Sequence, residues 1–349
     1  MLPVAAASEW AIPTIESVGA LADWLQLTPA ELEWFADLKA LGRKRSDARL
    51  QHYRYRVIQK SSGDIRLIEA SKMRLKELQR QILVQILDKI PPHPAVHGFI
   101  KGRSIKTFAG AHVGQQVVLR MDLKNFFPSF PAARIEAFFR TAGYPESVAD
   151  LLAGICTNAV PSDVWRKQRL AVDPLQLNRA RALYSRPHLP QGAPTSPALA
   201  NLCTYRLDCR LSALAHAVGS AYTRYADDLA FSGSGAFERR VGLFLTHVAA
   251  IVFEEGFTVQ HRKTRLMRQG ARQYLAGLVV NQSPNVVRAD FDRLKAILTN
   301  CVRHGPESQN REAHPSFRSH LEGRVGFVET INPAKGKRLR RIFKEIQWE

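Results

Sequence analysis

The stretch Ala221-Tyr-Thr-Arg-Tyr-Ala-Asp-Asp-Leu-Ala-Phe-Ser-Gly233 places two adjacent carboxylates, Asp227 and Asp228, between runs of apolar and strand-forming residues. The flanks, with Ser and Gly at the far end, predict a β-hairpin whose tight turn holds the two acids. A like-charged pair inside a strand-forming stretch repels itself and loses hydration, so it needs a counter-charge. A divalent cation is the natural one, and oxygen ligands suit Mg²⁺. Most Asp-Asp pairs are solvated turns, however, so this interpretation depends on motifs elsewhere in the chain.

A third acid, Asp122, stands near the carboxyl end of another apolar stretch, Val117-Val-Leu-Arg-Met-Asp-Leu123. This stretch predicts a buried strand, and a lone carboxylate there is costly unless it is paired or binds metal. Two structural alternatives are an ion pair with Arg120 and a cap for a helix that starts near Pro131. A third carboxylate would complete a two-metal site, so we expect Asp122 to lie beside the hairpin pair.

The composition favours a protein that binds nucleic acid. The chain has 349 residues, and its 50 Lys and Arg against 31 Asp and Glu give a net charge of +19 at pH 7. Such an excess attracts phosphates over much of a surface, although a generally basic protein is the alternative. With 45% hydrophobic residues, the chain can bury a substantial core and form two or three subdomains.

Cysteine usage and the N-terminus point to a cytoplasmic protein. The cysteines show neither Cys-x-x-Cys spacing nor an accompanying His cluster, which argues against a zinc site or a disulfide framework. They are Cys156, Cys203, Cys209 and Cys301. Val4 to Ala7 is apolar but lacks a basic flank, and the chain has no long apolar stretch, so neither export nor a membrane is predicted.

The first forty or so residues are expected to be helical, with Thr28-Pro-Ala-Glu31 as the cap of one helix. Two alternating segments, 52–58 and 65–68, then predict a β-hairpin. Lys60 and Arg66 lie near its turn, where two solvated cations are the alternative interpretation.

Ser71 is expected to open a helix that buries every third or fourth residue as far as Ile90 and ends at Pro91-Pro92. A basic loop punctuated by glycine follows, His97-Gly-Phe-Ile-Lys-Gly-Arg-Ser104, and it could bring backbone amides against phosphates.

Three further segments are predicted to approach the acids. Leu189–Leu202 predicts a turn into a helix, with Gln191 placed to contact a nucleotide; a helix entry built from Pro and Thr is the alternative. Phe257–Thr264 predicts a strand that carries Lys263 toward the same centre. Tyr274–Val280 predicts a strand in which a glycine lets another backbone pass closely.

Beyond Asn281, two basic helices are expected at 289–301 and 337–346, joined by a polar stretch. The basic residues of this region predict a surface that grips a nucleic-acid duplex. They are Arg288, Arg293, Lys295, Arg303, Arg338, Arg340, Arg341 and Lys344.

The order of these motifs resembles that of reverse transcriptases. The set comprises Asp122 with its Phe-Phe-Pro-Ser tail, the Leu-Pro-Gln-Gly-x-Pro-Thr-Ser-Pro segment, Tyr-Ala-Asp-Asp, the Lys263-Thr264 segment and the Gly277 segment. Within that class the chain is most similar to bacterial retron reverse transcriptases. The supporting features are the compact length, the Lys-x-x-Gly-x-x-Arg hairpin at Lys60, the loop at 97–104 and a short C-terminal region.

Two retron patterns are diverged in this chain. Asn-Ala-x-x-His appears as Phe108-Ala-Gly-Ala-His112, and Val-Thr-Gly appears as Leu275-Ala-Gly277. Both regions are associated in the family with recognition of the cognate RNA, so the divergence concerns the RNA partner rather than polymerisation.

The resemblance implies an α+β fold of the right-hand polymerase type. Residues 1–48 would form an N-terminal helical extension and residues 49–280 the fingers and palm, with the Tyr-Ala-Asp-Asp hairpin in an antiparallel palm sheet. Residues 281–349 would form a short basic helical thumb.

The resemblance also implies the roles of site residues. Asp122, Asp227 and Asp228 would hold two Mg²⁺ ions about 3.5–4 Å apart. Lys60 and Arg66 would clamp the triphosphate, Phe127 would exclude a ribose 2′-hydroxyl, Gln191 would steady the nucleotide and template base, and Lys263 would neutralise the leaving group. Contacts with RNA are expected at His97, Lys101, Arg103, His112, Gly277, Arg288, Arg293, Arg338 and Arg341.

A retron enzyme would use dNTPs to copy part of its own structured noncoding RNA into a branched RNA–DNA molecule, starting from a guanosine 2′-hydroxyl. It would act in antiphage defence with an effector protein. The alternatives are a group II-intron-like or abortive-infection reverse transcriptase, and a non-catalytic scaffold that only binds RNA. No maturase or HNH-type segment that would favour an intron enzyme is recognised in the sequence.

Overall fold

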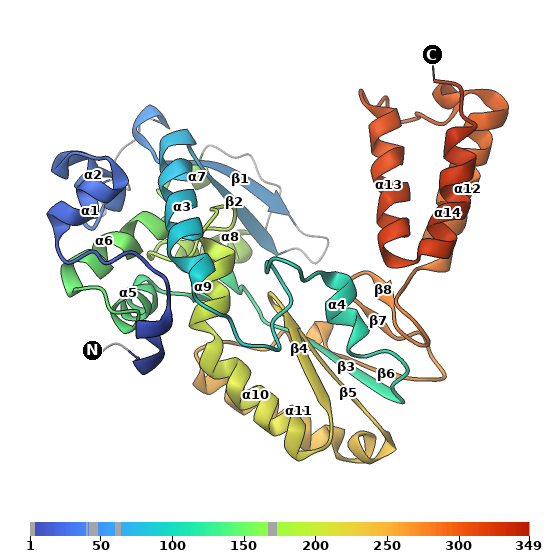
Figure 1. Cartoon of the computed structure of the whole chain (residues 1–349), viewed down its shortest axis with the longest axis horizontal. Coiled ribbons are helices and arrows are strands. Elements are labelled where there is room, and N and C mark those ends of the chain that lie inside the picture. The colour runs from blue at the N-terminus through green and yellow to red at the C-terminus, as the bar shows by residue number, and fades with distance from the viewer. Residues whose placement is uncertain (1–3, 40, 42–47, 60–63, 167–172, 349) are drawn as a thin grey trace. The chain divides into compact units, whose positions relative to one another are not determined.

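The computed structural model describes residues 4–39, 41, 48–59, 64–166 and 173–348 (Figure 1). It combines helices with antiparallel sheets, so the predicted α+β class is confirmed. The α-helices are α1 (Val18–Leu25), α2 (Pro29–Ala36), α3 (Met73–Gln85), α4 (Ile105–Gly110), α5 (Ala132–Thr141), α6 (Glu146–Cys156), α7 (Asp163–Arg166), α8 (Pro174–Tyr184), α9 (Ser196–Cys203), α10 (Tyr205–Ala217), α11 (Gly235–Glu254), α12 (Arg288–His304), α13 (Phe317–Ile331) and α14 (Pro333–Lys344). The strands are β1 (Tyr53–Gln59), β2 (Ile65–Ser71), β3 (Val117–Asp122), β4 (Ala221–Tyr225), β5 (Asp228–Gly233), β6 (Arg265–Arg268), β7 (Tyr274–Leu275), β8 (Leu278–Val279) and β9 (Asn285–Val286).

The chain divides into two compact units. The first unit comprises the segments Met1–Phe99, Leu123–Leu211 and Val248–Val259. The second unit comprises Ile100–Asp122, Ser212–His247 and Gln260–Glu349. Each unit therefore gathers segments that lie far apart in the sequence.

The first unit contains the predicted hairpin and the predicted helix cap. β1 pairs with β2 antiparallel from Tyr53 opposite Ser71 to Gln59 opposite Ile65. The turn that joins these strands, with Lys60, lies outside the described residues. Thr28 caps α2 through the expected reciprocal bonds, since its hydroxyl accepts from the Glu31 amide and the Glu31 carboxylate accepts from the Thr28 amide.

Ser71 does not open the following helix, contrary to the prediction. The β1–β2 ladder extends to Ser71, so this residue keeps an extended backbone and α3 starts only at Met73. The Ser71 hydroxyl instead donates to the buried Gln79 side chain at 2.6 Å. The predicted apolar face is confirmed, because Leu75 and Ile82 are buried.

In the second unit, one antiparallel sheet carries the acids (Figure 1). Its strands lie in the order β4-β5-β3-β6. Tyr225 pairs with Asp228, so only Ala226 and Asp227 form the turn of the predicted hairpin. Ala226 has a φ of +54°, which a two-residue hairpin turn requires.

The C-terminal part of the second unit contains a helix that sequence analysis missed. The stretch predicted as a polar connection includes α13, which packs against α14 (Figure 1). Its buried residues Leu321, Val325, Val328 and Ile331 follow a helical period of three and four. Gly323 and Gly326, together with several His and Arg residues, concealed that period in the sequence.

None of the helices among the described residues is long and apolar enough to cross a membrane.

Candidate active site

The strand register brings Asp122 and Asp228 together on one face of the sheet. Asp122, the last residue of β3, pairs directly with Asp228, the first residue of β5. Residues directly opposite in an antiparallel pair point to the same face, with Cβ atoms about 5 Å apart. Asp227 occupies the turn immediately before β5. The predicted convergence of the three acids at one end of this sheet therefore follows from the register.

Two basic side chains take up part of the negative charge. Lys263 Nζ donates to Asp122 Oδ2 at 2.7 Å. Arg120 donates to Asp228 Oδ1 from Nε at 2.9 Å and from Nη2 at 2.7 Å. The alternative pairing of Asp122 with Arg120 is thus wrong, because Arg120 reaches across to the neighbouring strand. The Asp122 side chain is only 6% exposed, whereas that of Lys263 is 49% exposed.

The segment that carries Lys263 is not the predicted strand. It makes a single bridge at Val259 and then a 3-10 helix at His261–Lys263, and the next ladder begins at Arg265 opposite Arg120. The amide of Gln260 also donates to the carbonyl of Asp122 at 2.7 Å. Lys263 therefore reaches Asp122 from the end of a 3-10 helix.

Burial and repulsion by the neighbouring acids destabilise the ionised form of Asp227, which lies in the hairpin turn. Burial first, and then the charges of Asp122 and Asp228, raise the pKa of Asp227 from 3.8 to about 6. Burial also raises the pKa of Asp228, although Arg120 opposes that shift. Among the described residues, Lys263 and Arg120 are the basic side chains that pair with these three carboxylates, so one negative charge is left without an ion pair there when all three acids are ionised.

The donor set fits a divalent cation. Among the residues that the structure describes, no group of three His, Cys, Asp or Glu side chains is arranged to hold a metal ion as it stands. Lys263 and Arg120 instead occupy oxygens of Asp122 and Asp228. The carboxylate oxygens are hard ligands, and the raised pKa of Asp227 shows that added positive charge would stabilise the site.

The predicted nucleotide-binding residues divide between the two units. Lys263 lies with the three acids in the second unit, whereas Arg66, Phe127 and Gln191 belong to the first. Arg66 is exposed on β2. The half-buried ring of Phe127 packs against that of Phe126, with 5.6 Å between the ring centroids.

The Gln191 segment is attached to β2. The backbone carbonyl of Gln191 accepts a hydrogen bond from the amide of Glu69 at 2.9 Å. At Gly192, φ is +133° and a Cβ atom would lie 3.0 Å from the Glu69 carbonyl oxygen, so only glycine fits. The Gly after Gln191 therefore allows the loop to lie directly on the strand that carries Arg66.

Most residues predicted to contact RNA are accessible. Lys101, Arg103, Arg288, Arg293, Arg338 and Arg341 are exposed, and His97 is half-buried. Arg288, Arg293, Arg338 and Arg341 belong to α12 and α14, the two C-terminal helices predicted from the sequence.

His112 differs from this group because it is fully buried. Its Nδ1 lies 2.7 Å from the hydroxyl of Ser232 on β5, and its Nε2 lies 2.7 Å from the hydroxyl of Thr223 on β4. Both ring nitrogens are therefore occupied inside the protein, and this side chain ties the end of α4 to the hairpin that carries the acids.

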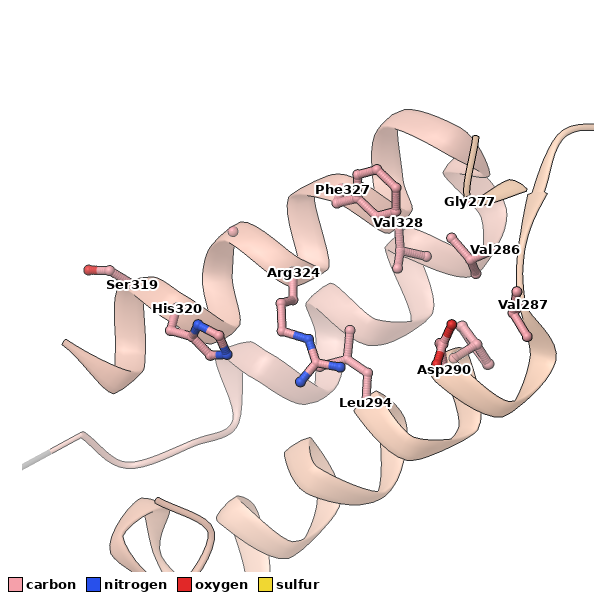
Figure 2. Close-up of a pocket in the computed structure, with 12 residues that line it drawn as sticks. Gly277, Val286, Val287, Asp290, Leu294, Ser319, His320, Arg324, Phe327 and Val328 are labelled. Atoms are coloured by element: carbon pink, nitrogen blue, oxygen red, sulfur yellow. The ribbon is translucent and has the colours of Figure 1, made fainter. Parts of the chain in front are cut away.

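Gly277 sits in a hairpin turn between β7 and β8, so the prediction of one continuous strand is wrong. Its φ of +90° explains the glycine, and no backbone atom lies within 4 Å of a Cβ placed there. Gly277 also lines a pocket of about 470 Å³. Figure 2 shows Arg324 and Phe327 of α13 together with Asp290 and Leu294 of α12 around this pocket.

The sequence matches the family model described as reverse transcriptase (RNA-dependent DNA polymerase) over residues 58–280. It is 42% identical over 299 residues to the retron Mx65 reverse transcriptase of Myxococcus xanthus, a match that covers 84% of this chain and 64% of that protein. The retron Mx162 reverse transcriptase of the same organism is 36% identical over 337 residues, with 93% of this chain and 65% of that protein covered. The retron Ec86 reverse transcriptase of Escherichia coli is 28% identical over 292 residues, with 82% of this chain and 79% of that protein covered. The chain thus spans just under two thirds of the length of the two Myxococcus proteins.

Proposed function

Since the chain belongs to the reverse transcriptase family, we propose that it polymerises DNA on an RNA template at the carboxylates of Asp122, Asp227 and Asp228. The observation that carries this proposal is the unbalanced negative charge at one end of the β4-β5-β3-β6 sheet. A buried acid whose charge is unmet is costly for a scaffold and useful for binding a cation.

The three acids would hold two Mg²⁺ ions, which supply activation of the primer hydroxyl and neutralise charge on the triphosphate. Lys263, half exposed and close to the acids, would neutralise the leaving pyrophosphate. Arg66 and Lys60 would bind the triphosphate, and Phe127 would exclude a ribose 2′-hydroxyl and so select deoxynucleotides. Gln191 would steady the nucleotide and the template base.

We assign the enzyme to a retron, because the relatives with the highest identities quoted above are retron reverse transcriptases. In this proposal it copies part of a structured noncoding RNA in the cytoplasm, and synthesis starts from a guanosine 2′-hydroxyl. The product is a branched, RNA-linked DNA that acts in antiphage defence with an effector protein.

The proposed division of labour follows the polymerase hand. Residues 1–48 are an N-terminal extension, residues 49–280 form fingers and palm, and residues 281–349 form a thumb that grips the RNA. Exposed Arg288, Arg293, Arg338 and Arg341 supply phosphate contacts in this region. The pocket beside Gly277 adds a partly apolar site between α12 and α13.

The polymerase proposal is tested by Mg²⁺-dependent dNTP incorporation on a generic primed RNA. We expect incorporation by the unaltered protein and none by the Asp227→Asn/Asp228→Asn double variant, while both bind RNA equally. Primer extension by the double variant, or none by the unaltered protein, would contradict the proposal.

The retron assignment is tested separately by sequencing the nucleic acid that copurifies with the protein. We expect DNA joined to RNA at an internal guanosine through a 2′ linkage that a debranching enzyme cleaves. If the active protein carries only linear DNA, the retron assignment fails and the polymerase proposal stands.

A further inference from the structure

An ion pair fully buried in the first unit has no part in the mechanism above. The side chains of Glu69 on β2 and His188 are 0% and 2% exposed, and Glu69 Oε2 lies 3.0 Å from His188 Nε2. The other Glu69 oxygen accepts from Asn158 Nδ2 at 2.7 Å, and the same amide group donates to the Tyr55 hydroxyl at 3.1 Å. Every partner belongs to the first unit.

The contacts of the ring favour the charged form of this pair. His188 Nδ1 lies 2.7 Å from the carbonyl oxygen of Arg186, which can only accept a hydrogen bond. Nε2 faces the Glu69 carboxyl group, which accepts when it is ionised, so an imidazolium ring beside a carboxylate satisfies both contacts. Burial alone would lower the pKa of His188, but the Glu69 charge and the bonds to Glu69 and Arg186 outweigh it and raise that pKa.

The pair lies where three segments of the chain meet. The backbones of His188 and Asn158 exchange two hydrogen bonds, at 2.9 and 3.0 Å. Shortly after His188 in the chain, the Gln191 carbonyl accepts from the Glu69 amide, and Gly192 rests on the Glu69 carbonyl. The strand of Glu69 also carries Arg66, on its opposite, exposed face.

A buried ion pair contributes little net stability, because the desolvation of both ions offsets their attraction. Its bonds are directional, however, and breaking one partner leaves an unpaired buried charge. A pair at this junction therefore selects one geometry of the 188–192 segment relative to β2.

We infer that Glu69 and His188 are positioning residues, which act through the Gln191–Gly192 loop to set the nucleotide site without touching the nucleotide. The inference rests on the proposed function, since it assumes that Gln191 and Arg66 bind the incoming dNTP. If it holds, the affinity for dNTP depends also on Glu69, on His188 and on their neutral neighbour Asn158.

The test compares Glu69→Gln with Glu255→Gln. Glu255 is an equally buried acid of the same unit, but it pairs with Arg206 and Arg210 instead of a residue beside the Gln191 loop. We expect Glu69→Gln to raise the KM for dNTP about tenfold while kcat changes about twofold or less. Glu255→Gln should lower the melting temperature similarly and leave the KM unchanged.

A second readout does not require activity. Hydrogen–deuterium exchange of the peptide that spans residues 188–193 should be about fivefold faster in Glu69→Gln than in Glu255→Gln. Asn158→Ala removes the hydrogen bonds from this amide to Glu69 and Tyr55 and keeps the ion pair. It should give smaller changes of the same kind if Glu69→Gln does not fold. Because Glu69 and His188 act as a unit, His188→Gln added to Glu69→Gln should raise the KM no further.

The outcomes separate the two proposals. Unchanged dNTP KM and unchanged exchange at 188–193 in folded variants would overturn the positioning role and leave the polymerase intact. Absence of incorporation by the unaltered protein would overturn the proposed function, and exchange at 188–193 would still decide whether the pair holds the loop.

Discussion

The Glu69 carboxylate is fully buried and those of Asp227 and Asp228 in the Tyr-Ala-Asp-Asp turn are partly buried, and the two sets of charges are balanced differently. Glu69 forms one ion pair, with His188, and both of its oxygens have hydrogen-bond partners. At the end of the β4-β5-β3-β6 sheet, three acids pair with two basic side chains of the described residues, Lys263 and Arg120, and the pKa of Asp227 is raised to about 6. The two proposals above rest on this difference: the acid whose charge is balanced would specify geometry, whereas the acids whose charges are not balanced would bind a cation.

The largest expected effect is on activity at the unbalanced site. Asp227→Asn keeps the shape of the side chain and removes its charge, so primer extension should fall about a thousandfold or more, because a metal ligand is lost. Single-turnover extension of a primed RNA measures the change. If the variant kept a tenth of the activity, Asp227 would have only a structural role in the turn, and the contrast between this site and the Glu69 site would fail.

The next effect is on stability and its dependence on pH. The pKa of Asp227 is higher in the folded protein than the ordinary value of 3.8, so the fold binds this proton more tightly than the unfolded chain does. The ionised acid therefore costs stability, and the cost grows from about pH 4 to about pH 6 and stays constant above.

Asp227→Asn removes that cost. Without Mg²⁺ at pH 8, the free energy of unfolding of the variant should be higher than that of the unaltered protein by about 1–2 kcal/mol, after allowance for solvent screening. The difference should fade near pH 4, where Asp227 is protonated in the folded state and largely so in the unfolded state. Urea denaturation at both pH values measures it. A variant that is less stable than the unaltered protein at pH 8 would contradict the charge imbalance.

A smaller effect concerns Arg120, the basic side chain that is hydrogen-bonded to Asp228. Arg120 donates two bonds to one oxygen of Asp228, and its side chain is 25% exposed. Arg120→Met removes a competing positive charge, so half-maximal thermal stabilisation should need about threefold less Mg²⁺. Melting curves over a Mg²⁺ series measure this. A higher Mg²⁺ requirement would mean that Arg120 holds Asp228 in place for the metal.

A last effect, of similar size, is expected at the pocket beside Gly277, which Asp290 of α12 and Arg324 of α13 both line. Gly323 lines this pocket, and a Cβ atom there would meet nothing within 4 Å. Gly323→Leu should fill the pocket without destabilising α13, because leucine is the better helix former. We expect affinity for the copurified RNA, measured at fixed salt, to fall about threefold.

Gly326→Ala is the matched control, since Gly326 lies on the same helix and is not among the residues that line the pocket. This variant should bind RNA as the unaltered protein does. Equal affinities for both variants would remove the pocket from the proposed RNA surface and leave the phosphate contacts of the arginines.

The sequence by itself predicted the chemistry proposed for the candidate site. Asp122, Asp227 and Asp228 stand in apolar strand-forming stretches, where few physical reasons other than metal binding justify a carboxylate, and local residue types predicted the hairpins at 52–68 and 221–233. Local patterns were weaker where glycine and polar residues interrupted a period, which is why α13 was missed.

Only the tertiary structure decided which charges meet. The pairing of Lys263 with Asp122, of Arg120 with Asp228 and of His188 with Glu69 depends on strand register and on turns that join segments over a hundred residues apart. Electrostatic energies change steeply with distance and burial, and neither quantity is encoded in spacing along the chain. Residue types therefore showed that Asp122, Asp227 and Asp228 require partners, whereas the fold selected those partners and alone showed the pairing of Glu69 with His188.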